Sequence, residues 1–391
     1  MTYYVGLDLA KHKHDCFVMD ENGEVIRDSF SFNNDSIGFN TLLNVLNALD
    51  PNQEKRIGLE ATGHYGSNLK IFLEKNDYSF MEINPLLINR FSKATTLRRT
   101  KTDKIDARLI ALYLMTADYK VYPLKSYHLR NLKSLCRSRD SLVKERSLQL
   151  VKLTNVLDLV FPEFKPFFNK SLKSSTALYL LENYAVPSKI ARLTKESYSK
   201  MASKLRKTIS YAKFVELKEL AKNTVGSEDS ILTFELNMYL DLFKELDSKI
   251  NEVESLIIEE YKTMNSHIHT IPGIGINSAA GIYSEIGEIS RFNNADQLVA
   301  FAGLDVSRYQ SGESDVTGKM VKHGSSYLRE YLMNVAESSL IHNPSLYEYY
   351  LKKRNEGKSH RVALSHVAKK LIRIIFSLEK NNTNFDMSKM R

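Results

Sequence analysis

Tyr3-Tyr4-Val5-Gly6-Leu7-Asp8-Leu9 decides the fold of the N-terminal part of this chain. The stretch is typical of a buried strand, and it carries Asp8 near its end. Two further strands are predicted over 16–20 and 24–32, joined by a turn at residues 21–23. The chain therefore opens with a three-stranded meander whose first strand holds an acid.

Strands and helices alternate after this meander. The pattern predicts a helix over 35–49, a strand over 56–60, a helix over 65–75, a strand over 78–83 and a last helix from about residue 103. A meander followed by alternating units gives a mixed sheet with helices on its faces. Glu60 ends the fourth strand, so adjacent central strands would bring Glu60 and Asp8 to one rim.

Two more acids lie in Lys101-Thr102-Asp103-Lys104-Ile105-Asp106-Ala107-Arg108, at the start of an amphipathic run. Their i, i+3 spacing places Asp103 and Asp106 on one helix face. A plain interpretation is a solvated helix start whose acids complement the macrodipole. Four carboxylates that converge repel one another unless they hold hard divalent cations, and two such metals promote phosphodiester chemistry.

A basic segment, 89–101, separates the sheet from the acidic helix and contains no acid. Beside a metal site it would hold a phosphate backbone, although a solvated surface loop has the same composition. Its candidate nucleic-acid contacts are Arg90, Lys93, Arg98, Arg99 and Lys101.

The middle of the chain carries two long helical stripes, over about 127–160 and 230–261. They can pair as an antiparallel coiled coil within one chain or join two copies. The second stripe is expected to bury one helix face, made of Leu242, Leu246, Ile250, Val253, Ile257 and Tyr261. Between the stripes, residues 189–222 hold ten Lys/Arg against three Glu with interleaved aromatics, which suits nucleic-acid contact or a small helical bundle with a solvated basic face.

Near the C-terminus, Ile271-Pro272-Gly273-Ile274-Gly275 resembles the turn of a helix-hairpin-helix, where backbone amides can take a DNA phosphate. A tight turn between packed helices is the alternative. A basic, Gly-broken stretch follows further on, and its candidate phosphate contacts are Lys319, Lys322 and Arg329.

Composition bounds the class of protein. The chain has 391 residues, and 55 Lys+Arg against 46 Asp+Glu give a net charge of +9, a mild push towards a polyanionic partner. Cys16 and Cys136 are the only cysteines, so neither a disulfide framework nor a cysteine zinc site is available. We expect no signal peptide, no membrane span and a cytoplasmic location.

Three motifs carry a resemblance that covers nearly the whole chain. Tyr4-Val5-Gly6-Leu7-Asp8, Gly58-Leu59-Glu60-Ala61-Thr62-Gly63 and Lys101–Ala107 resemble those of DEDD-type transposases of insertion-sequence family one-ten, which are bridge-RNA-guided recombinases. The resemblance implies a RuvC-like (RNase H-like) N-terminal domain. It also implies that its four acids, Asp8, Glu60, Asp103 and Asp106, are catalytic and bind two Mg²⁺ ions.

The same resemblance extends to the C-terminal part. The block from Phe292 to Arg329 is similar to the serine-bearing domain of the family, and the serine before glycine in a polar loop falls on Ser311, with Ser307 as its nearest competitor. The implied reaction is attack of Ser311 on a DNA phosphate, which gives a phosphoserine-linked strand. Many relatives read Ser-Lys-Arg-Gly-Asn where this chain has Val321-Lys322-His323-Gly324-Ser325, so finer phosphate contacts differ.

The predicted architecture is thus α/β plus all-α, in three domains. These are a RuvC-like mixed-sheet domain (1–125), a helical coiled-coil domain with a basic insert (126–265), and a mainly helical transposase domain with a helix-hairpin-helix-like turn (266–391). The resemblance implies donor and target DNA, a noncoding guide RNA and a homo-oligomer, a dimer or tetramer, as partners.

Three other functions fit parts of this pattern. A RuvC-like nuclease or junction resolvase would keep the acids and use water as nucleophile. A sugar-kinase or actin-type ATPase also opens with a strand-borne aspartate, but it needs glycines after it, where this chain has Leu9-Ala10-Lys11-His12. A non-catalytic scaffold would bind nucleic acid without cutting it.

Overall fold

The computed structural model describes residues 1–61, 65–95, 103–119, 127–169, 171–206, 208–311 and 314–389. The chain divides into two compact units, Met1–Lys125 and Ser126–Arg391. Three of the predicted nucleic-acid contacts, Arg98, Arg99 and Lys101, lie outside the described residues.

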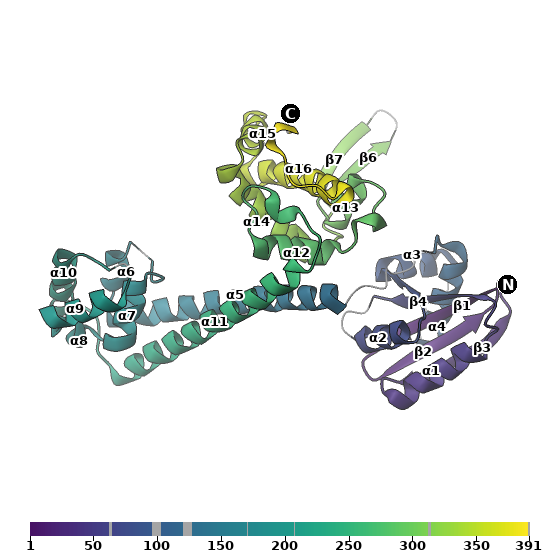
Figure 1. Ribbon diagram of the computed structural model, residues 1–391, viewed down its shortest axis with the longest axis horizontal. Coiled ribbons are helices and arrows are strands. Elements are labelled where there is room, and N and C mark those ends of the chain that lie inside the picture. Colours follow the sequence, from purple (N-terminus) through teal and green to yellow (C-terminus); the bar gives the residue numbers. More distant parts are fainter. Residues whose placement is uncertain are drawn as a thin grey trace. The chain divides into compact units, whose positions relative to one another are not determined.

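The first unit is built on a five-stranded mixed sheet in the order β3-β2-β1-β4-β5 (Figure 1). β1 pairs antiparallel with β2 and parallel with β4, β2 pairs antiparallel with β3, and β4 pairs parallel with β5. The strands are β1 (Thr2–Leu9), β2 (Lys13–Met19), β3 (Val25–Asn33), β4 (Glu54–Glu60) and β5 (Phe80–Ile83). A mixed sheet with a leading meander is therefore confirmed.

Four helices cover the two faces of this sheet: α1 (Ser36–Ala48), α2 (Ser67–Lys75), α3 (Pro85–Thr95) and α4 (Asp103–Thr116). Val5, Leu7 and Leu59 pack with α1 and α2 in one core. On the opposite face, Tyr4 and Phe17 pack with the α3 and α4 residues. Strand residues thus alternate between two buried faces, as the uninterrupted apolar strand pattern requires.

Helix α4 lies directly on the two central strands because both have glycine at the crossing. A Cβ atom on Gly6 would lie 2.0 Å from the backbone oxygen of Ala107 and 2.7 Å from the nitrogen of Ala111. A Cβ on Gly58 would lie 2.8 Å from a methyl carbon of Leu114. Gly6 and Gly58 are paired across β1 and β4, so together they form a flat surface without side chains on which α4 packs.

The second unit begins with two long antiparallel helices, α5 (Tyr127–Val160) and α11 (Ser230–Lys262), which pack along each other (Figure 1). Arg139 Nε lies 2.6 Å from Glu254 Oε1, and Arg146 pairs with Asp247. The two stripes therefore pair within one chain. Coiled-coil geometry in the strict sense stays a prediction.

The buried stripe of α11 differs from the expected one. Leu242 is 39% exposed, and Phe243 takes its place in the interface. The buried stripe follows a spacing of four and three residues, in which Asp247 and Glu254 fill two positions by pairing with arginines of α5. Ile250, Ile257 and Tyr261 of the expected stripe are buried, whereas Leu242 was wrong because acids paired with arginines complete the stripe.

Between the long helices, five short helices form a bundle around its own core: α6 (Phe164–Phe167), α7 (Ser175–Tyr184), α8 (Pro187–Ala191), α9 (Lys195–Lys204) and α10 (Tyr211–Lys222). Phe214 is 2% exposed, and its ring centroid lies 5.2 Å from that of Tyr198. These two aromatics of the basic stretch therefore serve the bundle core, whereas Lys195, Lys200 and Lys213 are exposed.

The remaining elements surround a core that also takes residues from the long helices, such as Leu132 and Tyr261. One feature was not expected: the segment predicted as a polar loop forms a two-stranded antiparallel hairpin, β6 and β7. The elements are η1 (Ile268–Thr270), α12 (Ile276–Ile286), η2 (Ile289–Arg291), α13 (Ala295–Phe301), β6 (Val306–Ser311), β7 (Ser314–Met320), α14 (Ser326–His342), α15 (Pro344–Asn355), α16 (His360–Asn381) and η3 (Met387–Lys389). Within the described residues, no helix combines the length and the apolar character that a bilayer crossing requires.

The close packing of α4 on Gly6 and Gly58 yields a stability prediction. Gly6→Ala should lower the free energy of unfolding by roughly 1–3 kcal/mol, because the added methyl group must push the backbone of α4 off the sheet. Gly275→Ala is the matched control, since a Cβ there meets nothing within 4 Å. Urea unfolding measures both variants. Equal stability of Gly6→Ala and the wild type would show that α4 does not lie on the sheet at this distance.

Candidate active site

Asp8 and Glu60 occupy equivalent places on the two central strands. The parallel register pairs Leu7 with Leu59, so Asp8 and Glu60 follow side by side at the carboxyl ends of β1 and β4. Asp8 shares the strand face of Tyr4 and Gly6, and Glu60 shares that of Gly58, which is the face under α4. Both carboxylates are partly buried.

The start of α4 lies toward these two strand ends. Near the start of the helix, Ala107 lies against Gly6 of β1. After the end of the helix, the Tyr119 hydroxyl accepts a hydrogen bond of 3.2 Å from the backbone N–H of Ile57, which lies closer to the amino end of its strand. The helix therefore runs from the carboxyl ends of the strands toward their amino ends. Asp106 directly precedes Ala107, and its side chain is partly buried.

Asp103 is the first residue of α4, one helical turn before Ala107. For Asp103 the structure describes the backbone only, which places this residue at the start of α4. Among the described side chains, no group of three or more His, Cys, Asp or Glu could hold a metal ion. The structure thus brings Asp8 and Glu60 to one rim and the start of α4 toward it.

The chemistry of this rim suits a hard cation. The donors are carboxylate oxygens, which Mg²⁺ prefers. Cys16 projects into the other core, where burial raises the pKa of its thiol, so it offers no thiolate to the rim. Oxygen donors on the α4 face are the ligands that hard divalent cations prefer.

Sequence reasoning missed Asp15. The antiparallel register places Asp15 directly opposite Asp8, on the same face of the sheet. Asp15 is 3% exposed, and one of its carboxylate oxygens accepts a hydrogen bond of 2.6 Å from the hydroxyl of Ser31. The signal was present in the alternation of β2, where Phe17 and Met19 share the α4 face two and four residues later.

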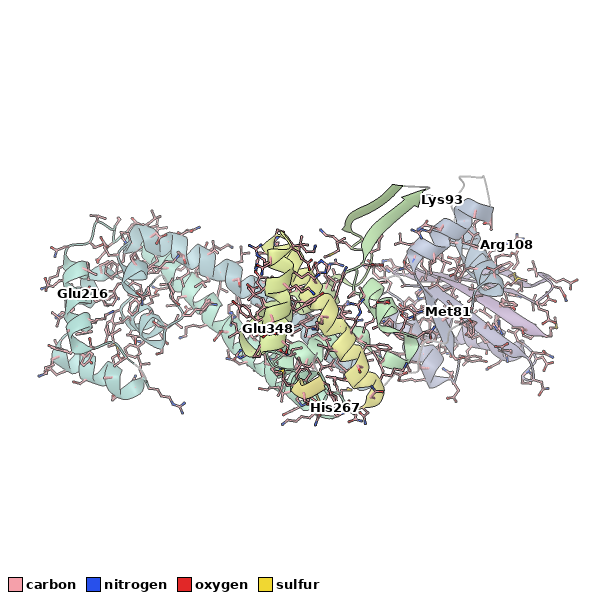
Figure 2. The ribbon with its side chains drawn as sticks, turned by 90° about the horizontal axis from the view of Figure 1, so that it is seen from above. Met81, Lys93, Arg108, Glu216, His267 and Glu348 are labelled. Carbon is pink, nitrogen blue, oxygen red and sulfur yellow. The ribbon has the colours of Figure 1, made fainter. Side chains whose placement is uncertain are left out.

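Helices α3 and α4 carry basic residues, among them Lys93 and Arg108, which are labelled in Figure 2. Arg90 and Lys93 are exposed on α3, as a phosphate contact requires. Arg108 follows Asp106 by two residues, and its guanidinium carbon lies 5.7 Å from the ring centroid of Phe17. Arg108 was not among the predicted contacts.

The predicted phosphate turn has a largely structural basis. Gly273 has φ +91°, and a Cβ there would lie 2.7 Å from the Cα of Ser339 in α14, so packing and backbone conformation both require glycine. Gly275 is exposed and precedes α12. A three-residue 3₁₀ helix, not an α-helix, precedes the turn, so the likeness to a helix-hairpin-helix is limited to the turn and α12.

Ser311 is the last residue of β6, and Ser307 is the second residue of the same strand. The expected polar loop is thus wrong at this point, because both serines belong to a paired strand. For these two serines the structure describes the backbone only.

The candidate contacts after the hairpin differ from one another. Lys319 belongs to β7, and Lys322 is exposed with φ +55°. Arg329 donates a hydrogen bond of 3.1 Å to the carbonyl oxygen of Ala302, so at least one of its N–H groups serves the fold.

Comparisons with known proteins match two parts of the chain, the sheet with α4 and the segment with the hairpin. A model of DEDD transposases, described as "Transposase", matches residues 5–162 and so covers the strands and α4 with all four acids. A second model, described as "Transposase IS116/IS110/IS902 family", matches residues 265–351 and covers the hairpin. The chain belongs to the IS110 family of DEDD transposases.

Relatives of this family member match along nearly its full length. The insertion element IS116 protein of Streptomyces clavuligerus is 23% identical over 98% of this chain and 96% of its own length. The putative transposase for IS117 of Streptomyces coelicolor is 22% identical over 99% and 96%. The pilin gene-inverting protein of Moraxella bovis is 24% identical over 98% and 97%. This transposase is therefore an enzyme that acts on DNA strands.

The rim predicts a measurable response to magnesium. Mg²⁺ should raise the free energy of unfolding of the wild type, by about 2.7 kcal/mol when the ion is at a hundred times its Kd, because an ion held by the acids binds only the folded state. Asp8→Asn should remove most of this gain, since it takes away a charged donor at the centre of the rim.

Urea unfolding with magnesium and with a chelator measures the effect. Asp158→Asn removes one charge from an exposed site on α5 and serves as the control, which should keep the full response. An equal response in Asp8→Asn and in the wild type would place the bound ion elsewhere.

Proposed function

We propose that this transposase cuts and rejoins DNA strands through a serine nucleophile, with Asp8, Glu60, Asp103 and Asp106 holding Mg²⁺ against the scissile phosphate. One observation supports this most: two acids end adjacent parallel strands on the face toward which α4, with the other two acids, begins. Carboxylates that converge repel one another, and a divalent cation held between them would relieve this repulsion.

The four acids would bind two Mg²⁺ ions as oxygen donors. Bound there, the ions would supply charge neutralisation of the phosphate and a lower pKa for a nearby hydroxyl. The exposed side chains of Arg90 and Lys93 on α3 would hold the neighbouring backbone phosphates.

Ser311 is the proposed nucleophile. Its Oγ–P bond forms as the bond between phosphorus and the 3′ oxygen breaks, which leaves a phosphoserine-linked strand and a free 3′ hydroxyl that has taken up a proton. Attack by a 3′ hydroxyl on the phosphoserine then reverses the step and frees the serine. The intermediate conserves the phosphodiester bond energy, so no ATP is required.

A noncoding guide RNA and a second copy of the chain are further proposed partners. The ten Lys/Arg between residues 189 and 222, with Lys195 and Lys200 exposed, suit an RNA backbone. Ile231 and Phe234, each 67% exposed on α11, offer an apolar stripe to another copy. Sequencing of co-purified RNA and measurement of particle mass test the two partners; no enriched noncoding RNA and a monomeric mass would contradict them.

The nucleophile is tested by trapping the intermediate on a DNA substrate. The wild type should form a protein–DNA adduct that survives denaturant and requires Mg²⁺. Ser311→Ala should lower adduct formation at least about 10³-fold, because no other group replaces the attacking oxygen.

Ser307→Ala is the matched control, with the same substitution in the same strand, and it should keep the adduct. Cleavage without any adduct would instead support a RuvC-like nuclease or resolvase that uses water. An adduct that survives in Ser311→Ala and disappears in Ser307→Ala would reassign the nucleophile.

A further inference from the structure

Glu285 is a buried carboxylate that the proposed chemistry does not use. It lies on α12 with its side chain 3% exposed. Arg137 of α5 donates to it twice, at 2.8 Å from Nε and 3.3 Å from a terminal nitrogen, and Lys133 Nζ lies 3.3 Å from its Oε2. A carboxylate this buried needs such partners, and removal of either side leaves an uncompensated charge.

A fourth contact of Glu285 leads toward the hairpin. The hydroxyl of Ser325 donates a hydrogen bond of 3.1 Å to Oε2 of Glu285. The same hydroxyl accepts one of 3.2 Å from the N–H of Leu328, which makes Ser325 the N-cap of α14. Ser325 thus joins the buried carboxylate to the segment that returns from β7.

That returning segment is held closely at the base of the hairpin. The backbone N–H of Ser325 donates to the carbonyl of Phe301 at 2.8 Å, and that of Val321 donates to the carbonyl of Asp305 at 2.9 Å. A Cβ on Gly324 would lie 2.0 Å from the carbonyl oxygen of Phe301. Both strands therefore leave the core from one fixed point, next to Ser325.

We propose that Glu285 is a positioning residue that acts through Ser325 to fix the direction of the β6–β7 hairpin. The hairpin strand β6 ends on Ser311, so the inference rests on the proposed function for its catalytic meaning. The guanidinium carbon of Arg137 also lies 4.4 Å from the ring centroid of Tyr327. The two hydrogen bonds from Arg137 to Glu285 connect the same point to α5. Glu285 thereby links the hairpin base to the long helix pair.

Ser325→Ala tests the link without leaving Glu285 unpaired, because Arg137 and Lys133 remain. At saturating DNA, the rate of adduct formation should fall by about 10²-fold, while the Kd for DNA stays the same, since only the placement of the reacting hydroxyl is lost. Ser325→Thr keeps both hydrogen bonds in kind and should restore the rate.

Ser174→Ala is the matched control for the lost helix cap. Ser174 caps α7, where its hydroxyl accepts a hydrogen bond of 3.1 Å from the N–H of Ala177, and no carboxylate of the described residues accepts a hydrogen bond from it. It should lower thermal stability as Ser325→Ala does and leave the adduct rate unchanged. Equal rates in the two alanine variants would overturn the positioning role.

A second readout does not depend on catalysis. Spin labels on cysteines placed at the exposed positions Ser147 and Gly318 report the distance between α5 and the hairpin. Ser325→Ala should broaden that distance distribution, and Ser174→Ala should not. If the wild type forms no adduct, the proposed function fails, while the label distances still decide the positioning role; an unchanged distribution in Ser325→Ala refutes it.

Discussion

The backbone of α4 lies against the backbone of β1, and the rest of the candidate site depends on this contact. Gly6 and Gly58 are neighbours across the two central strands, and neither has a side chain to keep the helix away. A helix seated this closely has little freedom to slide or tilt, because interiors are close-packed. Its start therefore has a fixed place relative to Asp8 and Glu60.

Charge is managed in two different ways in the two units. In the first, acids gather at the strand ends, and Asp15 opposite Asp8 adds a further buried carboxylate. In the second, Glu285 is matched by Arg137 and Lys133, and the pKa of Glu285 is lowered because these partners outweigh the burial that alone would raise it. The first arrangement suits the binding of a cation, and the second suits a rigid connection between α5, α12 and the start of α14.

The sheet and the places of Asp8 and Glu60 at the ends of adjacent strands could be predicted from the sequence because their signals are local. Each strand is a short apolar run, and Asp8 and Glu60 end two of them. The face that they share then follows from alternation alone. The place of α4 is less visible in the sequence, since it depends on Gly6 and Gly58 meeting across a register that only the fold defines.

Other features could not be found in this way. The hairpin lacks an apolar alternation because the described core contacts reach only Met320 at its base, so its polar residues resemble a loop. Glu285 is paired with Arg137, which lies 148 residues away in sequence, and no periodicity reveals such a partner. Phe243 is buried in the interface of the long helices, whereas Leu242 is exposed. The buried face of α11 includes two acids paired with arginines, so a search for apolar residues alone does not find it.

The most direct measurement is anomalous diffraction from crystals of this transposase grown with Mn²⁺ in place of Mg²⁺. The account predicts an anomalous peak bounded by the carboxylates of Asp8, Glu60 and Asp106, at the carboxyl ends of β1 and β4. A peak at any other place, or none at these acids with the metal in excess, would contradict it.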